Sequence, residues 1–182
     1  MLGLGSSLLH SGSIADTLLF SYTSDFTSSI DSFIAQSIED SASDLTLTYN
    51  ETISGSDGWL KGVFAEDQAS PGGIKWHDGT VAMFPDNGLT GDYFTYSYKI
   101  YLHDTSTWGS DDVRTSLNVL NIHHYDQITP EGVVNVSGTS TFSGDDYDRN
   151  GPMFIWNLVD DQPSASAVFY IKDVRVDLYR PY

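Results

Sequence analysis

Four aromatic side chains stand out because the sequence around them places them outside an apolar core. Trp76 and Trp108 lie in polar segments, whereas Tyr93 and Tyr101 lie on the polar side of an alternating run. An aromatic ring is apolar on its face, which suits the apolar face of a pyranose ring. We therefore predict that these four residues contact a sugar. For Trp76 and Trp108, packing within a loop or at an interface is the alternative.

Acidic residues occur in adjacent pairs within segments that are typical of loops: Glu66–Asp67, Asp111–Asp112, Asp145–Asp146 and Asp160–Asp161. Calcium prefers several oxygen ligands, but no pair has the spacing of an EF-hand loop. A structural calcium therefore stays open beside the simpler interpretation that the acidity keeps the protein soluble. His123 and His124 in the pattern HHYD are adjacent, and adjacent residues of a strand point to opposite sides, so they predict no transition-metal site.

The sequence lacks the patterns of the common catalytic sites. It contains no GxSxG or HExxH motif, no phosphate-binding glycine loop and no cysteine. With 25 acidic residues, some pair of carboxylates will lie at glycosidase spacing by chance, so such a pair has no predictive value. We therefore predict no enzymatic activity and no cofactor other than the open calcium.

The formal net charge of −17 excludes one class of partner. The first basic residue is Lys61, and binding to nucleic acid requires clustered Lys and Arg, so we expect no nucleic-acid partner. No apolar run approaches the roughly 18 residues that span a bilayer, so we expect no membrane partner. The first residues contain no basic group and no long apolar stretch, so we expect no secretory signal and synthesis in a cytoplasm.

Two long runs with a period of two must position these side chains. In residues 167–179 the residues Val174, Val176 and Leu178 alternate with polar residues, and the four apolar residues 168–171 are expected to be buried on both faces. Residues 92–103 alternate in the same way over their whole length. Both runs predict strands that cross the core, and we expect them to be companions in one sandwich.

Shorter runs predict further strands, at residues 17–22, 32–36, 45–51, 59–64, 80–84, 115–123, 132–142 and 153–159. Gly62 inside one run indicates a bulge or close packing, and a change of phase predicts a bulge near Val119. Residues 66–79 are rich in Asp, Pro and Gly and predict a long surface loop that carries Trp76. No helical period is sustained. We therefore predict an all-β, antiparallel two-sheet β-sandwich with jelly-roll or Greek-key connections.

The first residues differ in composition from this domain. Residues 1–16 combine Gly and Ser with Leu2, Leu4, Leu8 and Leu9, and they show neither period two nor a helical period. Disordered tails are normally poor in apolar residues. We therefore divide the chain into an N-terminal extended arm, residues 1–16, and a single sandwich domain, residues 17–182. The arm's leucines are expected to dock on a neighbouring subunit.

Several of these strand patterns resemble the carbohydrate-binding modules that have a galactose-binding-like jelly roll. The resemblance rests on SDF at 24–26, DGWLKG at 57–62, YFTYSYKIYL at 93–102 and FYIKDVRV at 169–176. It implies a jelly roll that binds a glycan. In that family the closing strand commonly carries two acidic residues before the valine, one of which can hold a structural calcium. Here Lys172 replaces the first, so the resemblance leaves Asp173 as the candidate ligand.

The setting of the domain resembles that of small bacteriophage virion proteins, in which such jelly rolls occur on capsids, tails and fibres. This analogy implies a structural component of a phage particle, a capsid-decorating or tail protein assembled through its arm. Its partners would be other virion subunits or further copies of itself, and it would reside in the virion after synthesis in the host cytoplasm. The alternative is a carbohydrate-binding module that recognises a glycan through exposed aromatic residues.

Overall fold

The structure is a computed structural model that describes residues 15–31, 33–37, 45–65, 72–76, 90–103, 113–119, 122–128, 132–141, 154–159 and 166–182. The described regular elements are all strands: β1 (Thr17–Ser24), β2 (Phe33–Ser37), β3 (Leu45–Ile53), β4 (Ser56–Phe64), β5 (Gly72–Trp76), β6 (Tyr93–His103), β7 (Val113–Val119), β8 (Ile122–Ile128), β9 (Val133–Thr141), β10 (Phe154–Val159) and β11 (Val168–Arg180). No helix among the described residues is long and apolar enough to cross a membrane. The predicted leucine arm and the strand expected at 80–84 lie outside the described residues.

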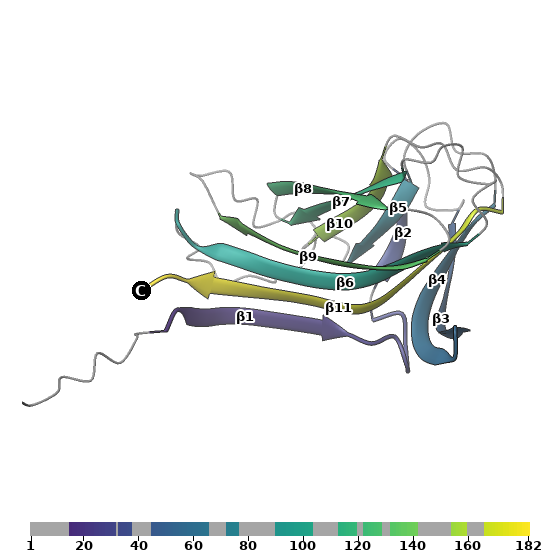
Figure 1. Ribbon diagram of the computed structural model, residues 1–182, viewed down its shortest axis with the longest axis horizontal. Coiled ribbons are helices and arrows are strands. Elements are labelled where there is room, and N and C mark those ends of the chain that lie inside the picture. The colour runs from purple at the N-terminus through teal and green to yellow at the C-terminus, as the bar shows by residue number, and fades with distance from the viewer. Residues whose placement is uncertain are drawn as a thin grey trace, which may run out of the picture.

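The strands form two antiparallel sheets that face each other in Figure 1. The first sheet has the order β3-β4-β11-β6-β9, and β1 also pairs with β11. The second sheet has the order β2-β5-β10-β7-β8. Neighbours such as β1 and β11 lie at opposite ends of the sequence, so the sheets are built from distant segments. The predicted fold class, an all-β antiparallel sandwich of two sheets, is confirmed.

Strands β6 and β11 are paired along almost their whole length, from Val168 opposite His103 to Tyr179 opposite Tyr93. In β6 the even-numbered residues are buried, and the odd-numbered ones from Tyr93 to Tyr101 are half-buried, as period two requires. The expectation that these two runs are companions is therefore confirmed. The core between the sheets combines their inward residues with side chains from the second sheet, such as Phe33 and Ile74.

Strand β11 changes phase at a bulge, which corrects one expectation. Phe169 and Ile171 face the core before the bulge, and Val174, Val176 and Leu178 face it afterwards. The register against β6 shifts between Lys172 and Arg175, and Asp173 adopts the left-handed conformation with φ of 52°. The apolar run 168–171 is therefore not buried on both faces, because Val168 and Tyr170 lie on the outer side and are half-buried.

The same bulge divides the neighbours of β11 on its second edge. Strand β4 pairs with residues 168–171, and β1 pairs from Val174 onward. Figure 1 shows β3 and β4 turning away from the sheet at one end while β1 runs beside β11 at the other. Gly62 of β4 lies against the ring of Phe169, since a Cβ there would come within 2.2 Å of it. The prediction of close packing at Gly62 is thus confirmed.

Two further expectations were wrong in detail. The predicted loop at 66–79 contains strand β5, which pairs with both β2 and β10 in the second sheet. The predicted bulge near Val119 is the end of β7, and β8 begins at Ile122, which pairs back with Val119. The change of phase in the sequence therefore marks the point at which the chain reverses direction between β7 and β8. Ile122–Ile128 forms a strand that the sequence did not predict.

Candidate functional site

The outer face of the six-stranded sheet, on the side away from the core, carries a continuous set of polar and aromatic residues. Period two places the odd-numbered residues of β6 there, from Tyr93 to Tyr101. After the bulge, β11 contributes Arg175, Asp177 and Tyr179, which lie opposite Ser97, Thr95 and Tyr93 of β6. We call this surface the outer face.

Each end of the outer face carries a tyrosine pair that joins β6 to β11. At one end the rings of Tyr93 and Tyr179 are stacked, with centroids 5.3 Å apart and planes at 18°. At the other end the rings of Tyr101 and Tyr170 lie 5.8 Å apart. Tyr101 lies eight positions after Tyr93 along the strand, which corresponds to a distance of about 26 Å at a rise of about 3.3 Å per residue. The two pairs therefore mark the ends of an elongated surface.

Hydrogen bonding and burial raise the pKa of one tyrosine in each pair, Tyr93 and Tyr170. The Tyr93 hydroxyl donates to Asp16 Oδ2 at 2.7 Å, and this bond raises the pKa of Tyr93 above its ordinary value. The backbone N–H of Tyr182 also donates to Asp16, at 3.3 Å. Burial raises the pKa of Tyr170, and the Lys61 ammonium lies 5.9 Å from the centroid of that ring.

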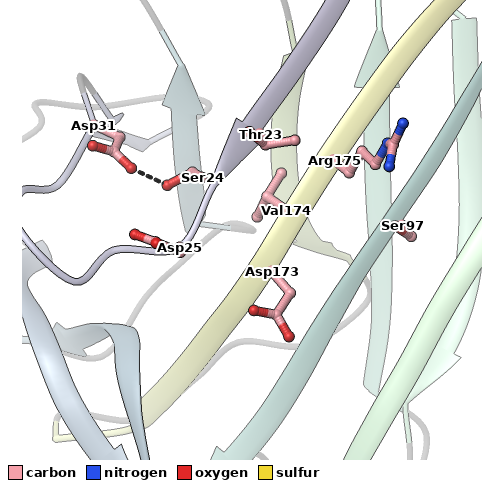
Figure 2. A pocket seen from close by; sticks show the side chains of 8 residues that line it. All are labelled: Thr23, Ser24, Asp25, Asp31, Ser97, Asp173, Val174 and Arg175. Atoms are coloured by element: carbon pink, nitrogen blue, oxygen red, sulfur yellow. Dashed lines mark hydrogen bonds between the residues drawn. The ribbon is translucent and has the colours of Figure 1, made fainter.

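Two hollows lie between the tyrosine pairs. The larger, of about 500 Å³, lies where β1 ends and β11 bulges, and Figure 2 shows the side chains that line it: Thr23, Ser24, Asp25, Asp31, Ser97, Asp173, Val174 and Arg175. The smaller, of about 340 Å³, is lined by residues of β6, β9 and β11, among them Thr95, Ser137 and Thr139. Most residues in both linings carry a hydroxyl or carboxylate group, so the centre of the outer face offers polar groups to a ligand.

The side chain of Arg175 borders both hollows. Its Nε donates to Asp177 Oδ2 at 2.6 Å, and the other oxygen of that carboxylate accepts from Ser21 Oγ at 2.5 Å. The side chain of Asp177 is only 5% exposed, whereas that of Arg175 is 57% exposed. The hydrogen bond to Asp177 raises the pKa of Arg175 further above its ordinary value. A buried carboxylate therefore holds an exposed guanidinium in place.

The carboxylates of the larger hollow are also engaged. Asp31 accepts from Ser24 and Ser29. Asp25 accepts from the backbone N–H of Thr27 at 3.1 Å and from its hydroxyl at 2.9 Å, and these bonds lower the pKa of Asp25. The hydrogen bonds favour the charged form of the carboxylate, which explains the direction of the shift.

Asp173, the residue expected to hold calcium, lies on the bulge of β11. Its Oδ2 is 2.6 Å from Lys99 Nζ. The neighbouring Lys172 ammonium donates to Ser56 Oγ at 2.8 Å and to the carbonyl of Asp57. Within the described ranges, no three His, Asp or Glu side chains gather as a metal site requires. A calcium ion at Asp173 would have to displace the Lys99 ammonium, so this ion pair competes with the calcium that the sequence left open.

The structure does not bring the four residues predicted to contact a sugar together at one site. Tyr93 and Tyr101 lie on the outer face, at opposite ends. Trp76 ends β5 in the second sheet, where its backbone pairs with Phe33 and Phe154, and its side chain lies outside what the structure describes. Trp108 also lies outside the described residues. These four positions therefore remain predictions as a binding set.

The sequence prediction missed the partners of Tyr93 and Tyr101. Tyr170 and Tyr179 belong to β11, as do Arg175 and Asp177 at the hollows. One signal was present, because period two put Arg175, Asp177 and Tyr179 on the polar side of that run. The register that places them beside β6 and β1 required the structure.

No protein-family model and no curated protein matches this chain. Among solved structures, the chain is similar to the CBM22-1 xylan-binding domain of Paenibacillus barcinonensis Xyn10C, with a TM-score of 0.53 and 12% identity over 92% of this chain and 98% of that domain. The CBM22-1–CBM22-2 tandem domain of the same xylanase gives a TM-score of 0.52 and 12% identity, over 92% of this chain and 48% of the tandem. A family 29 carbohydrate-binding module gives a TM-score of 0.44 and 13% identity.

At these identities the similarity is one of fold. The chain has the jelly-roll β-sandwich of carbohydrate-binding modules, which is the fold that its strand motifs predicted.

Proposed function

We propose that this chain is a carbohydrate-binding module that holds a glycan without cleaving it. The observation that carries the proposal is the outer face, on which two tyrosine pairs flank a polar centre. Aromatic rings pack against sugar rings, and the hydroxyl and carboxylate groups between them can hydrogen-bond to sugar hydroxyls. The jelly roll shared with a xylan-binding domain supports the proposal and makes xylan-type chains the first ligands to test.

The proposal favours binding over catalysis for a physical reason. The carboxylates at the larger hollow are held by hydroxyl, amide or ammonium donors: Asp31 by Ser24, Asp25 by Thr27 and Asp173 by Lys99. For Asp25 this lowers the pKa, the opposite of what a general acid requires near neutral pH. Carboxylates of this kind accept hydrogen bonds from a ligand and do not protonate a leaving group.

The test is binding of xylohexaose and cellohexaose, measured by isothermal titration calorimetry. We expect the wild type to bind at least one of them, and Tyr93→Ala and Tyr101→Ala each to weaken binding by about fivefold, because a lost aromatic contact of about 1 kcal/mol changes Kd by that factor. Tyr49→Ala is the matched control, because Tyr49 is a 48% exposed tyrosine outside both pairs. Equal affinities for all four proteins would contradict the proposal.

The role in a phage particle expected from the sequence stays a prediction. Its arm, with Leu2, Leu4, Leu8 and Leu9, lies outside the described residues, and the similar structures are carbohydrate-binding modules. Of the two functions considered, the glycan-binding one is therefore the better supported. A phage role would require that removal of residues 1–14 prevents incorporation into particles.

A further inference from the structure

The two Arg–Asp pairs with a buried carboxylate in the described part of the chain differ in how their guanidinium groups are used. Arg180 donates two hydrogen bonds to Asp92, from Nε to Oδ1 at 3.0 Å and from Nη2 to Oδ2 at 2.8 Å. The side chain of Arg180 is 30% exposed. This bidentate pair ties β11 to the residue that precedes β6, and we interpret it as structural. Arg175 contacts Asp177 through Nε at 2.6 Å, with its side chain 57% exposed.

This difference leaves donors of Arg175 available at the surface. A guanidinium has N–H groups on Nε, Nη1 and Nη2 and accepts no hydrogen bond. Only the Nε–H contact to Asp177 is seen among the described residues, and Arg175 borders both hollows. Asp177 cannot turn away easily, because it is buried and its other oxygen is bound by Ser21. The guanidinium is therefore held in position before any ligand arrives.

The surroundings of Arg175 define what it can bind. Its strand neighbours across the sheet are Thr23 of β1 and Ser97 of β6, and Ser97 in turn lies opposite Ser137 of β9. This row supplies hydroxyl groups that both donate and accept, beside the donor-only guanidinium. Sugar hydroxyls have the same dual character, and two adjacent hydroxyls of a pyranose match the fork of a guanidinium.

Charge decides between neutral and acidic glycans. The positive charge of Arg175 is balanced by Asp177 and that of Lys99 by Asp173, while Asp25 and Asp31 add negative charge at the larger hollow. The whole chain carries a formal charge of −17. A chain of uronate residues would be repelled by this field, whereas an uncharged chain would not.

We propose, on the basis of the function proposed above, that Arg175 is the specificity-determining residue of the outer face and binds adjacent hydroxyls of an uncharged, linear glycan. The glycan lies along β6 and β11 from one tyrosine pair to the other, with Arg175 at its centre. Asp177 and Ser21 are positioning residues that act through Arg175.

The test compares two conservative substitutions. Arg175→Lys keeps the positive charge but loses the fork and the Nε–H donor, whereas Arg180→Lys makes the same change in the structural pair. Binding of xylohexaose, cellohexaose and a galacturonic acid hexamer is measured for both variants and the wild type. We expect Arg175→Lys to weaken binding of the preferred neutral hexamer by tenfold or more, and Arg180→Lys to bind it as the wild type does. The galacturonic acid hexamer is expected not to bind.

Each contrary result has its own meaning. If the wild type binds neither neutral hexamer, the proposed function fails, and this inference with it. If the wild type binds and Arg175→Lys binds equally well, only the role of Arg175 is overturned. Tighter binding of the galacturonic acid hexamer would overturn the assignment to uncharged glycans. Asp177→Asn serves as a second variant, because it keeps the shape of the side chain and the contact with Ser21. We expect it to bind the neutral hexamer more weakly than the wild type. We also expect it to show a cooperative melting transition, which establishes that it is folded.

Discussion

At the scale of residues, the outer face consists of side chains that hold one another in place. Asp16 fixes the Tyr93 hydroxyl, Asp177 fixes Arg175, and Lys99 fixes Asp173. A surface whose side chains are already ordered loses less entropy when a ligand binds. Of these residues, Tyr93 was singled out by its strand pattern and Asp173 by the family resemblance. The sequence could not predict Asp177 with Ser21, because 156 positions separate the two.

The tyrosines predict a loss of stability at alkaline pH. Burial raises the pKa of Tyr22 and Tyr170, and the bond to Asp16 raises that of Tyr93. As pH rises past about 10, these groups lose protons first in the unfolded chain, so the free energy of unfolding falls with increasing pH above that value. Between pH 7 and 9 they contribute no pH dependence. Urea unfolding at pH 8, 9, 10 and 11 measures this.

Tyr22→Phe provides the control for that experiment. Removing the most strongly shifted hydroxyl should make the alkaline decline shallower, whatever the variant's stability at pH 8. A free energy of unfolding that stays constant from pH 8 to 11 would contradict the assigned directions.

The ion pair on the bulge predicts how the protein responds to calcium. Lys99 Nζ neutralises Asp173 at 2.6 Å, so we expect neither EDTA nor millimolar calcium to change the melting temperature. Asp173→Asn should also have a small effect, of at most about 1 kcal/mol, because both side chains are 42% exposed and exposed pairs contribute little. A melting temperature that falls in EDTA, in the wild type but not in Asp173→Asn, would establish the calcium site instead.

At the scale of elements, period two predicted β6 and the second half of β11, but not the point at which β11 changes phase. The apolar residues before the bulge are odd-numbered on the core side, and those after it are even-numbered. The position of this change could not be located from the sequence, because the run of four apolar residues also fits a strand buried on both faces. Asp173 was the available signal, since Asp tolerates the left-handed conformation better than most residues.

Other misses at this scale have a similar cause. Strand β5 consists of five residues within a segment rich in turn-forming residues, so its pairing with β2 and β10 outweighs its local propensity. Strand β8 carries the sequence IHHYDQI, whose polar residues gave no clear alternation of apolar side chains. In both strands the tertiary partners decide the structure.

The contact between β4 and β11 predicts that a larger residue at Gly62 lowers the stability of the fold. A Cβ at Gly62 would come within 2.2 Å of the fully buried Phe169 ring, so Gly62→Ala must displace a core side chain. We expect a loss of about 1–3 kcal/mol in the free energy of unfolding, as for other overpacked cores. Gly132→Ala is the control, because a Cβ there meets nothing within 4 Å. Equal stability of the two variants, measured by urea unfolding, would contradict the described packing.

At the scale of the whole molecule, the outer face and the second sheet are the two broad surfaces of the sandwich. The first carries the tyrosine pairs, the two hollows and Arg175. The second contains β5, and hence Trp76, which the sequence pattern also favoured for sugar contact. A jelly roll can host a ligand on either sheet, so the fold by itself does not choose between them. The choice of the outer face rests on its side chains.

The most direct test of this choice is to map the bound glycan by amide chemical-shift changes in the ¹⁵N-labelled protein titrated with xylohexaose or cellohexaose, whichever binds. We predict that the largest changes occur in β6 and β11, near Ser97, Arg175 and the two tyrosine pairs, and that Arg175→Lys reduces them. Changes confined to β2, β5, β10, β7 and β8 would place the glycan on the second sheet and contradict the account.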